Sequence, residues 1–288
     1  MGFINRLFHL HLKTLWEYST DGILWRLINC EDEYFVGEDR NVDSKFVTFF
    51  CVEQRSGKVL WNDVGLNEKW WSGIESIHRN ILLIHGYATP DMPDHKKIYA
   101  FDIKTGKQLW MNEDITFLFS YKGSIYTSKD TYENKLYFVM NPSDGEYIRE
   151  IDPDEINSIV RKASEEEVDL RKFPNSFDSQ SQMSPEFNTI TRKAIDSKKN
   201  IEMIEYIETP YLYIFTYYEP LDAVLHPSGY RQDIVVVERR MNNVIYRGCM
   251  NSNTKALHPE TYFSIGDYLY YIQERKKLIA LHLPSNRK

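Results

Sequence analysis

Three carboxylates in the sequence stand where they could serve acid–base chemistry. Glu75, Asp114 and Glu205 lie near segments that we predict to be inner strands. Hydrolysis of a glycosidic bond needs two carboxyl groups about 5–10 Å apart, one acting as acid and the other as base or nucleophile. These residues are therefore the catalytic candidates. A charge at a strand end, or one lining a solvated channel, explains each of them too, and we favour that interpretation.

A second set of residues suits recognition of a ligand or partner. An exposed indole ring can anchor a partner, and alternation along a strand would bury one ring of the Trp pair and could expose the other. Two histidines share a Leu-His-Pro context, and another follows an Asp closely enough to bind a cation. No further ligand has the spacing of a metal site, so we expect neither a metal nor a cofactor. The candidates for the binding face are Trp70, Trp71, Asp94, His95, His226, Tyr230 and His258.

Recurring hairpins supply the elements that position these side chains. In each, a strand runs into a tight turn containing Gly or Asn and then into a second strand. Another pair of short strands lies upstream of each hairpin, so the unit has four strands and returns every ~40–50 residues. Such repeats predict an all-β propeller of four-stranded antiparallel blades. The hairpin segments are QRSGKVLW, DIKTGKQLW, NPSDGEYIR and RRMNNVIYR.

The two ends of the chain complement each other. KKLIALHLPSNRK (276–288) matches the start of KKIYAFDIKTGKQLW (96–110) but lacks its last strand, and residues 13–16 resemble residues 107–110. We therefore expect the N-terminal strand to pair into the last blade, which closes the ring and removes an exposed edge. Five blades are predicted; the alternative is six, with a degraded blade near 185–200.

One segment does not have a strand pattern. Residues 152–199 are expected to form a helical and polar insertion within a single domain of residues 1–288. Pro153 and Ser164 mark the expected starts of two helices, the first with a capping box and Pro at its first position.

The segments FDIKTGKQLW (101–110) and VEQRSGKVLW (52–61) resemble the repeats of quinoprotein-like β-propellers, in which an apolar strand, a Thr/Ser-Gly-Lys turn and a Leu-Trp strand recur. The resemblance implies the fold. Members of that family that oxidise alcohols use a bound quinone, vicinal cysteines and a calcium site. This chain has three cysteines, none adjacent to another. The resemblance thus implies a propeller of unknown function without the quinone-enzyme site.

Bulk properties exclude other classes. A net charge of −7 argues against a sequence-independent grip on nucleic acid. No apolar run reaches the ~20 residues of a membrane span, and the N-terminal residues lack a run of signal-peptide length. We expect a cytoplasmic monomer.

Loop lengths indicate which face carries function. Turns on one face of the predicted blades are short, whereas connections on the other are long and varied, and binding residues concentrate on such loops. We predict a non-enzymatic module that binds a protein or peptide through this face. The alternative is a glycan-active enzyme or small-ligand binder that uses carboxylates in an axial pocket. The long connections are residues 62–71, 88–95, 152–199, 219–230 and 251–260.

Overall fold

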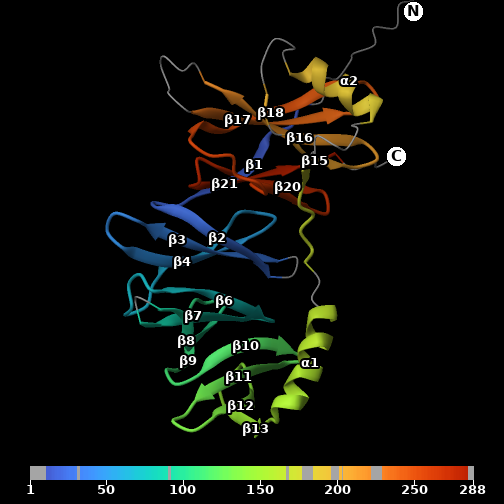
Figure 1. Cartoon of the computed structure of the whole chain (residues 1–288). Coiled ribbons are helices and arrows are strands. Elements are labelled where there is room, and N and C mark those ends of the chain that lie inside the picture. Colours follow the sequence, from blue (N-terminus) through green and yellow to red (C-terminus); the bar gives the residue numbers. More distant parts are fainter. Residues whose placement is uncertain are drawn as a thin grey trace, which may run out of the picture. The chain divides into compact units, whose positions relative to one another are not determined.

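The described part of the chain folds mainly into antiparallel sheets (Figure 1). The computed structural model describes residues 11–30, 33–89, 92–166, 169–176, 184–195, 201–202, 204–221 and 229–284. Strands in these ranges form four sheets of four strands and one of five. Two helices accompany them, and neither has the length and hydropathy of a membrane-spanning segment. The expected all-β class and the four-stranded antiparallel unit are confirmed.

Contacts divide the chain into two compact units, and the first is residues 20–170. Its three sheets each follow the order of the sequence. The first sheet contains β2 (Ile23–Cys30), β3 (Tyr34–Asn41), β4 (Phe46–Glu53) and β5 (Val59–Val64). The second contains β6 (Ser72–His78), β7 (Ile81–Thr89), β8 (Met92–Asp102) and β9 (Gln108–Asn112). The third contains β10 (Thr116–Tyr121), β11 (Ser124–Asp130), β12 (Lys135–Met140) and β13 (Tyr147–Glu150), and helix α1 (Pro153–Glu166) follows it.

The terminal unit combines residues 1–19 with residues 171–288. Its five-stranded sheet contains β14 (Asn175–Ser176), β15 (Ile204–Glu208), β16 (Leu212–Pro220), β17 (Tyr230–Glu238) and β18 (Asn243–Thr254), with helix α2 (Pro185–Ala194) between β14 and β15 in the chain. The last sheet has the order β1-β21-β20-β19, formed by β1 (Thr14–Ser19), β21 (Lys277–His282), β20 (Tyr268–Gln273) and β19 (Tyr262–Ile265).

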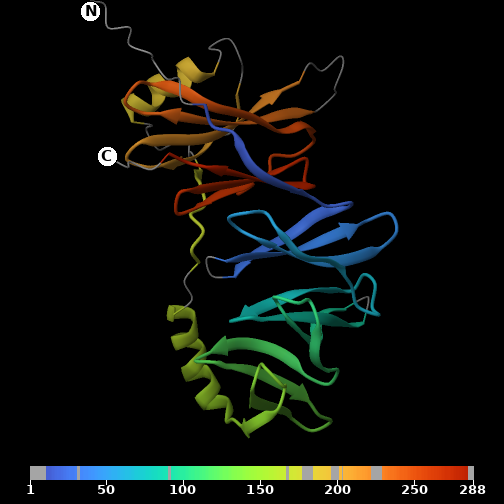
Figure 2. The ribbon, with the colours of Figure 1, turned by 180° about the vertical axis from the view of Figure 1, so that it is seen from behind.

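The first strand of the chain completes the last sheet. Strand β1 pairs antiparallel with β21, placing Trp16 opposite Ala280 and Tyr18 opposite Leu278. In Figure 2 this blue strand lies beside the red strands of the C-terminal segment. The predicted pairing of the N-terminal strand into the last sheet is therefore confirmed. It covers an edge of β21 that would otherwise expose unpaired backbone groups.

Apolar residues face both ways in the inner strands, as expected for stacked sheets. In the 20–170 unit, Leu82 and Ile84 of β7 pack into a cluster with Phe49 of the first sheet. Leu83, between them in sequence, points to the other face and packs into a cluster with Ile125 of the third sheet. Both faces of the second sheet are thus buried, which explains the unbroken apolar run at 81–84.

Each Leu-Trp strand of the repeat docks on the next sheet. Trp61 donates from Nε1 to the carbonyl oxygen of Ile103 at 2.5 Å, and Trp110 donates likewise to Pro142 at 2.7 Å. The ring of Trp61 also lies against Gly106 in the turn between β8 and β9. That glycine has φ 66°, a left-handed conformation which glycine adopts without strain. The Thr-Gly-Lys turn of the second sheet therefore provides the surface against which Trp61 of the first sheet packs.

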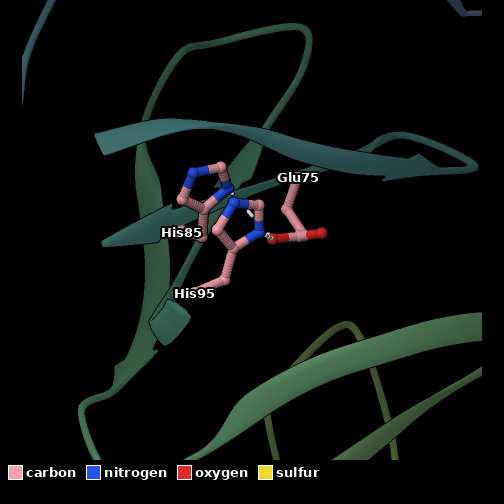
Figure 3. Close-up of side chains that lie close together, drawn as sticks. All are labelled: Glu75, His85 and His95. Atoms are coloured by element: carbon pink, nitrogen blue, oxygen red, sulfur yellow. Dashed lines mark hydrogen bonds and ion pairs between the residues drawn. The ribbon is translucent and has the colours of Figure 1, made fainter. Parts of the chain in front are cut away.

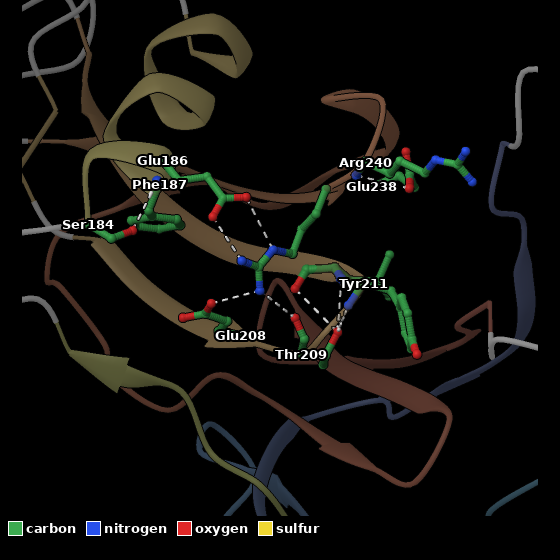
Figure 4. A network of polar contacts seen from close by, with 10 residues as sticks. Ser184, Glu186, Phe187, Glu208, Thr209, Tyr211, Glu238 and Arg240 are labelled. Atoms are coloured by element: carbon green, nitrogen blue, oxygen red, sulfur yellow. Dashed lines mark hydrogen bonds and ion pairs between the residues drawn. The ribbon is translucent and has the colours of Figure 1, made fainter.

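Helix α2 covers one face of the five-stranded sheet. Ser184 caps it, accepting a hydrogen bond from the backbone N–H of Phe187 at 3.2 Å (Figure 4). Phe187 and Ile190 are buried in a cluster with Phe215 and Val235 of the sheet. This apolar stripe at helical spacing fixes the helix to the sheet.

The structure corrects three details of the predicted connections. Ser164 lies inside α1 and does not begin a second helix; the second helix is residues 185–194. The alternative of six blades placed a degraded blade near 185–200, and the described residues 185–194 of that segment form this helix instead of a strand. Residues 88–95 do not form a long loop, since β7 continues to Thr89 and β8 begins at Met92. The prolines and aspartates of this segment had indicated a loop.

Candidate functional site

Two histidines and a glutamate converge on the second sheet of the 20–170 unit (Figure 3). Oε2 of Glu75 lies 2.8 Å from Nδ1 of His95 and 2.9 Å from Nδ1 of His85. The two imidazole rings stack face to face, with centroids 3.6 Å apart and planes 10° apart. One carboxylate oxygen thus lies close to both rings.

Irregularities in strand pairing create this convergence. Between β6 and β7 the register shifts from Ile74 to Ser76, so Glu75 is an extra residue without a cross-strand partner. Between β7 and β8 a second shift leaves Lys97 unpaired, with φ 68°. Such bulges re-aim side chains. The second brings His95 opposite Tyr87, two residues beyond His85 in β7.

His85 is the most enclosed member of the cluster. It is 4% exposed, and neither ring nitrogen has a hydrogen-bond partner of good geometry among the described residues. The side chain of Glu75 is 15% exposed and that of His95 is 40% exposed. Burial alone would raise the pKa of Glu75, but the neighbouring imidazoles of His85 and His95 together outweigh it and lower the pKa below its usual value. The glutamate is therefore held as a carboxylate.

Close packing of small and aromatic residues surrounds the cluster. Tyr87 meets both imidazole rings edge-on, with centroids 5.3 Å from His85 and 5.5 Å from His95. Trp71 in turn meets Tyr87 edge-on at 5.9 Å. Gly73 lies beside His85, and a Cβ there would come within 3.1 Å of the ring. These contacts fix the position of His85.

A cavity of about 460 Å³ adjoins Glu75. Strand β6, strand β10 with its following turn, and helix α1 form its walls. This volume falls in the range of small-molecule sites. Its lining residues are Glu75, Ser76, Ile77, His78, residues 117–122, Val160, Ala163 and Ser164.

The other two candidate carboxylates do not line this cavity. Asp114 is exposed and pairs with Lys129, with 3.0 Å between Oδ2 and Nζ. This contact lowers the pKa of Asp114. Glu205 is fully buried in the terminal unit, where Oε1 accepts a hydrogen bond from the backbone N–H of Glu260 at 3.0 Å. Burial raises the pKa of Glu205.

The predicted binding residues divide among several places. Trp70 is half-buried, with the Nζ of Lys45 4.7 Å above its ring, and Trp71 is 38% exposed. Asp94 and His95 lie in β8 rather than on a loop, and His95 pairs with Glu75 and not with Asp94.

In the terminal unit, Tyr230 begins β17 and meets the ring of Tyr218 edge-on at 6.4 Å. The backbone N–H of His258 donates to the hydroxyl of Tyr218 at 3.0 Å. His226 lies outside the described residues.

Sequence reasoning identified Glu75 and His95 separately but missed His85. The segment Ile81–His85 was assigned to a strand, in which His85 follows four apolar residues. A histidine that continues an apolar run is a signal that could have singled it out, because a buried imidazole needs a polar partner.

Comparisons with known proteins add little to this picture. The profile of a domain of unknown function, DUF4905, matches residues 28–110, a segment shorter than half of the chain that includes Glu75, His85 and His95. No curated protein matches the sequence significantly.

Several solved structures share a distant likeness. A europium-containing methanol dehydrogenase matches with a TM-score of 0.30 and 10% identity over 92% of this chain and 52% of its own, so the chain spans about half the length of that enzyme. BamB from Moraxella catarrhalis matches with a TM-score of 0.28 and 8% identity over 96% of this chain and 99% of its own. The Dos1 propeller matches with a TM-score of 0.30 and 12% identity over 96% of this chain and 77% of its own. Such likenesses define no activity here; the class that the strand pairing itself defines is an all-β protein of antiparallel sheets, most of them four-stranded.

Proposed function

We propose that the chain is a non-enzymatic binding module of the β-propeller type. In this proposal the five sheets are five blades of one domain, and β1 closes the last of them. The recurring Trp–Gly docking between successive sheets and the pairing of β1 with β21 support it. The predicted monomeric state and cytoplasmic location stay predictions.

The observation that carries the binding role is an exposed aromatic surface in the 20–170 unit. We call it the indole patch and define it by Trp25, Arg40, Lys45, Trp70 and Trp71. The guanidinium of Arg40 lies 5.8 Å from the ring of Trp25 and 5.4 Å from that of Trp70. Trp25 is 59% exposed, and because it flanks Arg40 together with Trp70 it belongs to an aromatic cluster and is not a single exposed side chain; such a patch marks an interaction site.

Charge in the indole patch points to the kind of partner. Arg40 is already paired with the buried Glu38 at 2.8 Å, so its charge is compensated. Lys45 is exposed and makes no ion pair with a described residue. We therefore propose a peptide segment that sets an apolar side chain against Trp25 and a carboxylate against Lys45, because aromatic and cationic anchors dominate such interfaces.

Selection from a random displayed-peptide library against the full chain tests this function. The proposal expects enriched sequences that contain acidic residues and whose affinity falls about 10-fold or more in Trp25→Ala and in Lys45→Ala. Tyr132→Ala is the control, because Tyr132 is fully exposed outside the patch. Enriched peptides that bind both variants as tightly as wild type, or the absence of any enriched sequence, would refute the proposal.

A small-ligand binder is the second candidate, and the cavity beside Glu75 favours it. A glycan-active enzyme would need a second carboxylate there, and neither Asp114 nor Glu205 lines the cavity. Ligand-observed NMR with a panel of mono- and disaccharides tests both the small-ligand binder and the glycan-active enzyme. Binding that Glu75→Gln weakens and Asp114→Asn spares supports the binder. If both variants leave every glycan interaction and hydrolysis assay unchanged, neither Glu75 nor Asp114 takes part in such a function.

A further inference from the structure

We propose that Glu75, His85 and His95 bind a divalent transition-metal ion of the zinc type. The inference is independent of the peptide-binding role, since it depends only on this cluster.

The donor set determines the class of ion. Two imidazole nitrogens and one carboxylate oxygen lie within 4.8 Å of one another. Zn²⁺ and neighbouring first-row ions prefer this mixture of nitrogen and oxygen ligands, whereas Mg²⁺ and Ca²⁺ take oxygen alone. Three protein ligands leave at least one position for water or for a ligand, which distinguishes this arrangement from closed four-ligand structural sites.

The cluster is incompletely satisfied by its own hydrogen bonds. Nδ1 of His85 lies 2.9 Å from Oε2 of Glu75 but is out of line for a hydrogen bond. The hydrogen bond to that oxygen is made by Nδ1 of His95, at 2.8 Å. A buried polar nitrogen without a partner is unfavourable, and an ion between these atoms would supply what His85 lacks.

Binding requires one movement, and the exposed histidine can make it. A metal ion lies near the plane of each imidazole that coordinates it, so two rings 10° from parallel cannot both point at one ion. His85 is enclosed by Tyr87 and Gly73 and stays in place. The His95 side chain is 40% exposed, so its ring can turn out of the stack. Its backbone remains fixed, because the hydroxyl of Thr116 donates to the carbonyl oxygen of His95 at 3.1 Å.

Local structure holds the remaining ligands ready. The bulge at Glu75 aims its carboxylate at His85 across the strand pair, and burial of both side chains restricts their rotamers. Ligands fixed in this way lose little conformational entropy when an ion binds. Glu75 also lines the cavity, so a molecule in the cavity would lie close to the ion.

Isothermal titration calorimetry tests the proposal: the full chain is first freed of metal with a chelator and then titrated with Zn²⁺. We expect one Zn²⁺ per chain, no binding of Mg²⁺ or Ca²⁺, and a higher Tm with Zn²⁺. His95→Ala and Glu75→Gln should each weaken binding at least about 10-fold. His95 is the better site for a variant because its exposure makes misfolding less of a concern. Asp94→Asn and His258→Gln are matched controls and should bind within about twofold of wild type.

Titration with Co²⁺ gives a second readout that a loss of stability alone would not change. Wild type should develop intense visible d–d bands typical of four or five ligands, and folded His95→Ala should not. Failure of wild type to bind Zn²⁺, or equal binding by wild type, His95→Ala and Glu75→Gln, overturns the site. Loss of binding in Asp94→Asn would move the site to Asp94 and overturns it as well.

Discussion

Gly106 lies directly against the indole ring of Trp61: a Cβ at this glycine would come within 2.8 Å of the ring atom Cδ2. The relationship repeats one sheet further on, where a Cβ at Gly145 would come within 2.7 Å of Trp110. In both cases the tryptophan ends one four-stranded unit and the glycine belongs to the last turn of the next. Glycine is therefore required in the turn for two reasons: its backbone has a positive φ, and the indole ring leaves no space for a Cβ.

Replacing Gly106 by alanine should destabilise the 20–170 unit by about 2–4 kcal/mol. About 1 kcal/mol comes from the left-handed backbone at φ 66°, and about 1–3 kcal/mol from the displaced ring of Trp61. Urea unfolding followed by tryptophan fluorescence measures the change.

Gly266→Ala separates these two contributions. Gly266 has φ 54°, but nothing lies within 4 Å of its Cβ position, so only the backbone cost of about 1 kcal/mol is expected. Equal losses in the two variants would show that the contact with Trp61 contributes nothing.

The fold could be predicted from local signals, whereas the candidate site could not. Each tight turn and Leu-Trp strand is encoded within about ten residues, and turn chemistry alone predicts a hairpin there. The cluster of Glu75, His85 and His95 depends on two bulges that shift the register by one residue each. A register shift has no marker of its own in the sequence, and the prolines near residue 90 indicated a loop where the strands continue. The hydrogen bond that Glu205 accepts likewise comes from Glu260, which is distant in sequence.

Strand β1 should contribute to the stability of the terminal unit through the side chains of one face only. Trp16 is 8% exposed and its ring lies 5.9 Å from that of Tyr270, whereas the adjacent Leu15 is 47% exposed. We expect Trp16→Ala to lower the free energy of unfolding of the terminal unit by about 3–5 kcal/mol. Leu15→Ala should change it by no more than about 0.5 kcal/mol. Chemical denaturation of the two variants measures the difference, and a similar effect of both would argue against burial of this face of β1.

Lysine should not be able to replace Arg239 in holding helix α2 to the sheet. Its guanidinium contacts Glu186 at 2.9 Å, Glu208 at 2.8 Å and the carbonyl oxygen of Thr209 at 3.0 Å, and it lies 4.4 Å from the centre of the Tyr213 ring. In Figure 4 Glu186 and Glu208 are joined to this one group by dashed lines. A lysine cannot make these planar contacts together, so Arg239→Lys should cost about 1–2 kcal/mol and loosen α2.

Hydrogen exchange of the α2 amides, together with thermal unfolding, measures the effect of Arg239→Lys. Arg149→Lys is its control, because the pair of Arg149 with Glu155 is exposed on both sides and its replacement should leave the stability nearly unchanged. Unchanged exchange in α2 would show that the helix is held by Phe187 and Ile190 alone.

Glu205 should make the stability of the protein fall as pH rises above the ordinary pKa of glutamate. Burial is the main cause that raises its pKa above 4.5, and the charge of Glu260 adds to it, while the backbone N–H of Glu260 and the hydroxyl of Thr216 act in the opposite direction. Because the folded state holds the proton more tightly, this contribution to stability is fully present below pH 4.5. It is lost as pH rises through the folded pKa. Above that pH, wild type retains a buried carboxylate whose Oε2 has no hydrogen-bond partner among the described residues.

A neutral amide at this position removes that pH dependence. Glu205→Gln should therefore be more stable than wild type at pH 8, and the difference should shrink as pH falls towards 4.5. A gain of 1 kcal/mol would appear as a rise of about 2–4 °C in Tm. Glu186→Gln should differ from wild type in the other direction, because Arg239 lowers the pKa of Glu186. The contribution of its carboxylate is fully present above the ordinary pKa and is lost as pH falls through the folded pKa, so this variant should be less stable than wild type at neutral pH and approach it only below pH 4.5. Thermal unfolding of wild type and both variants from about pH 3 to pH 8 measures the trends on both sides of the ordinary pKa. Parallel curves for wild type and Glu205→Gln would mean that Glu205 reaches water in the folded protein.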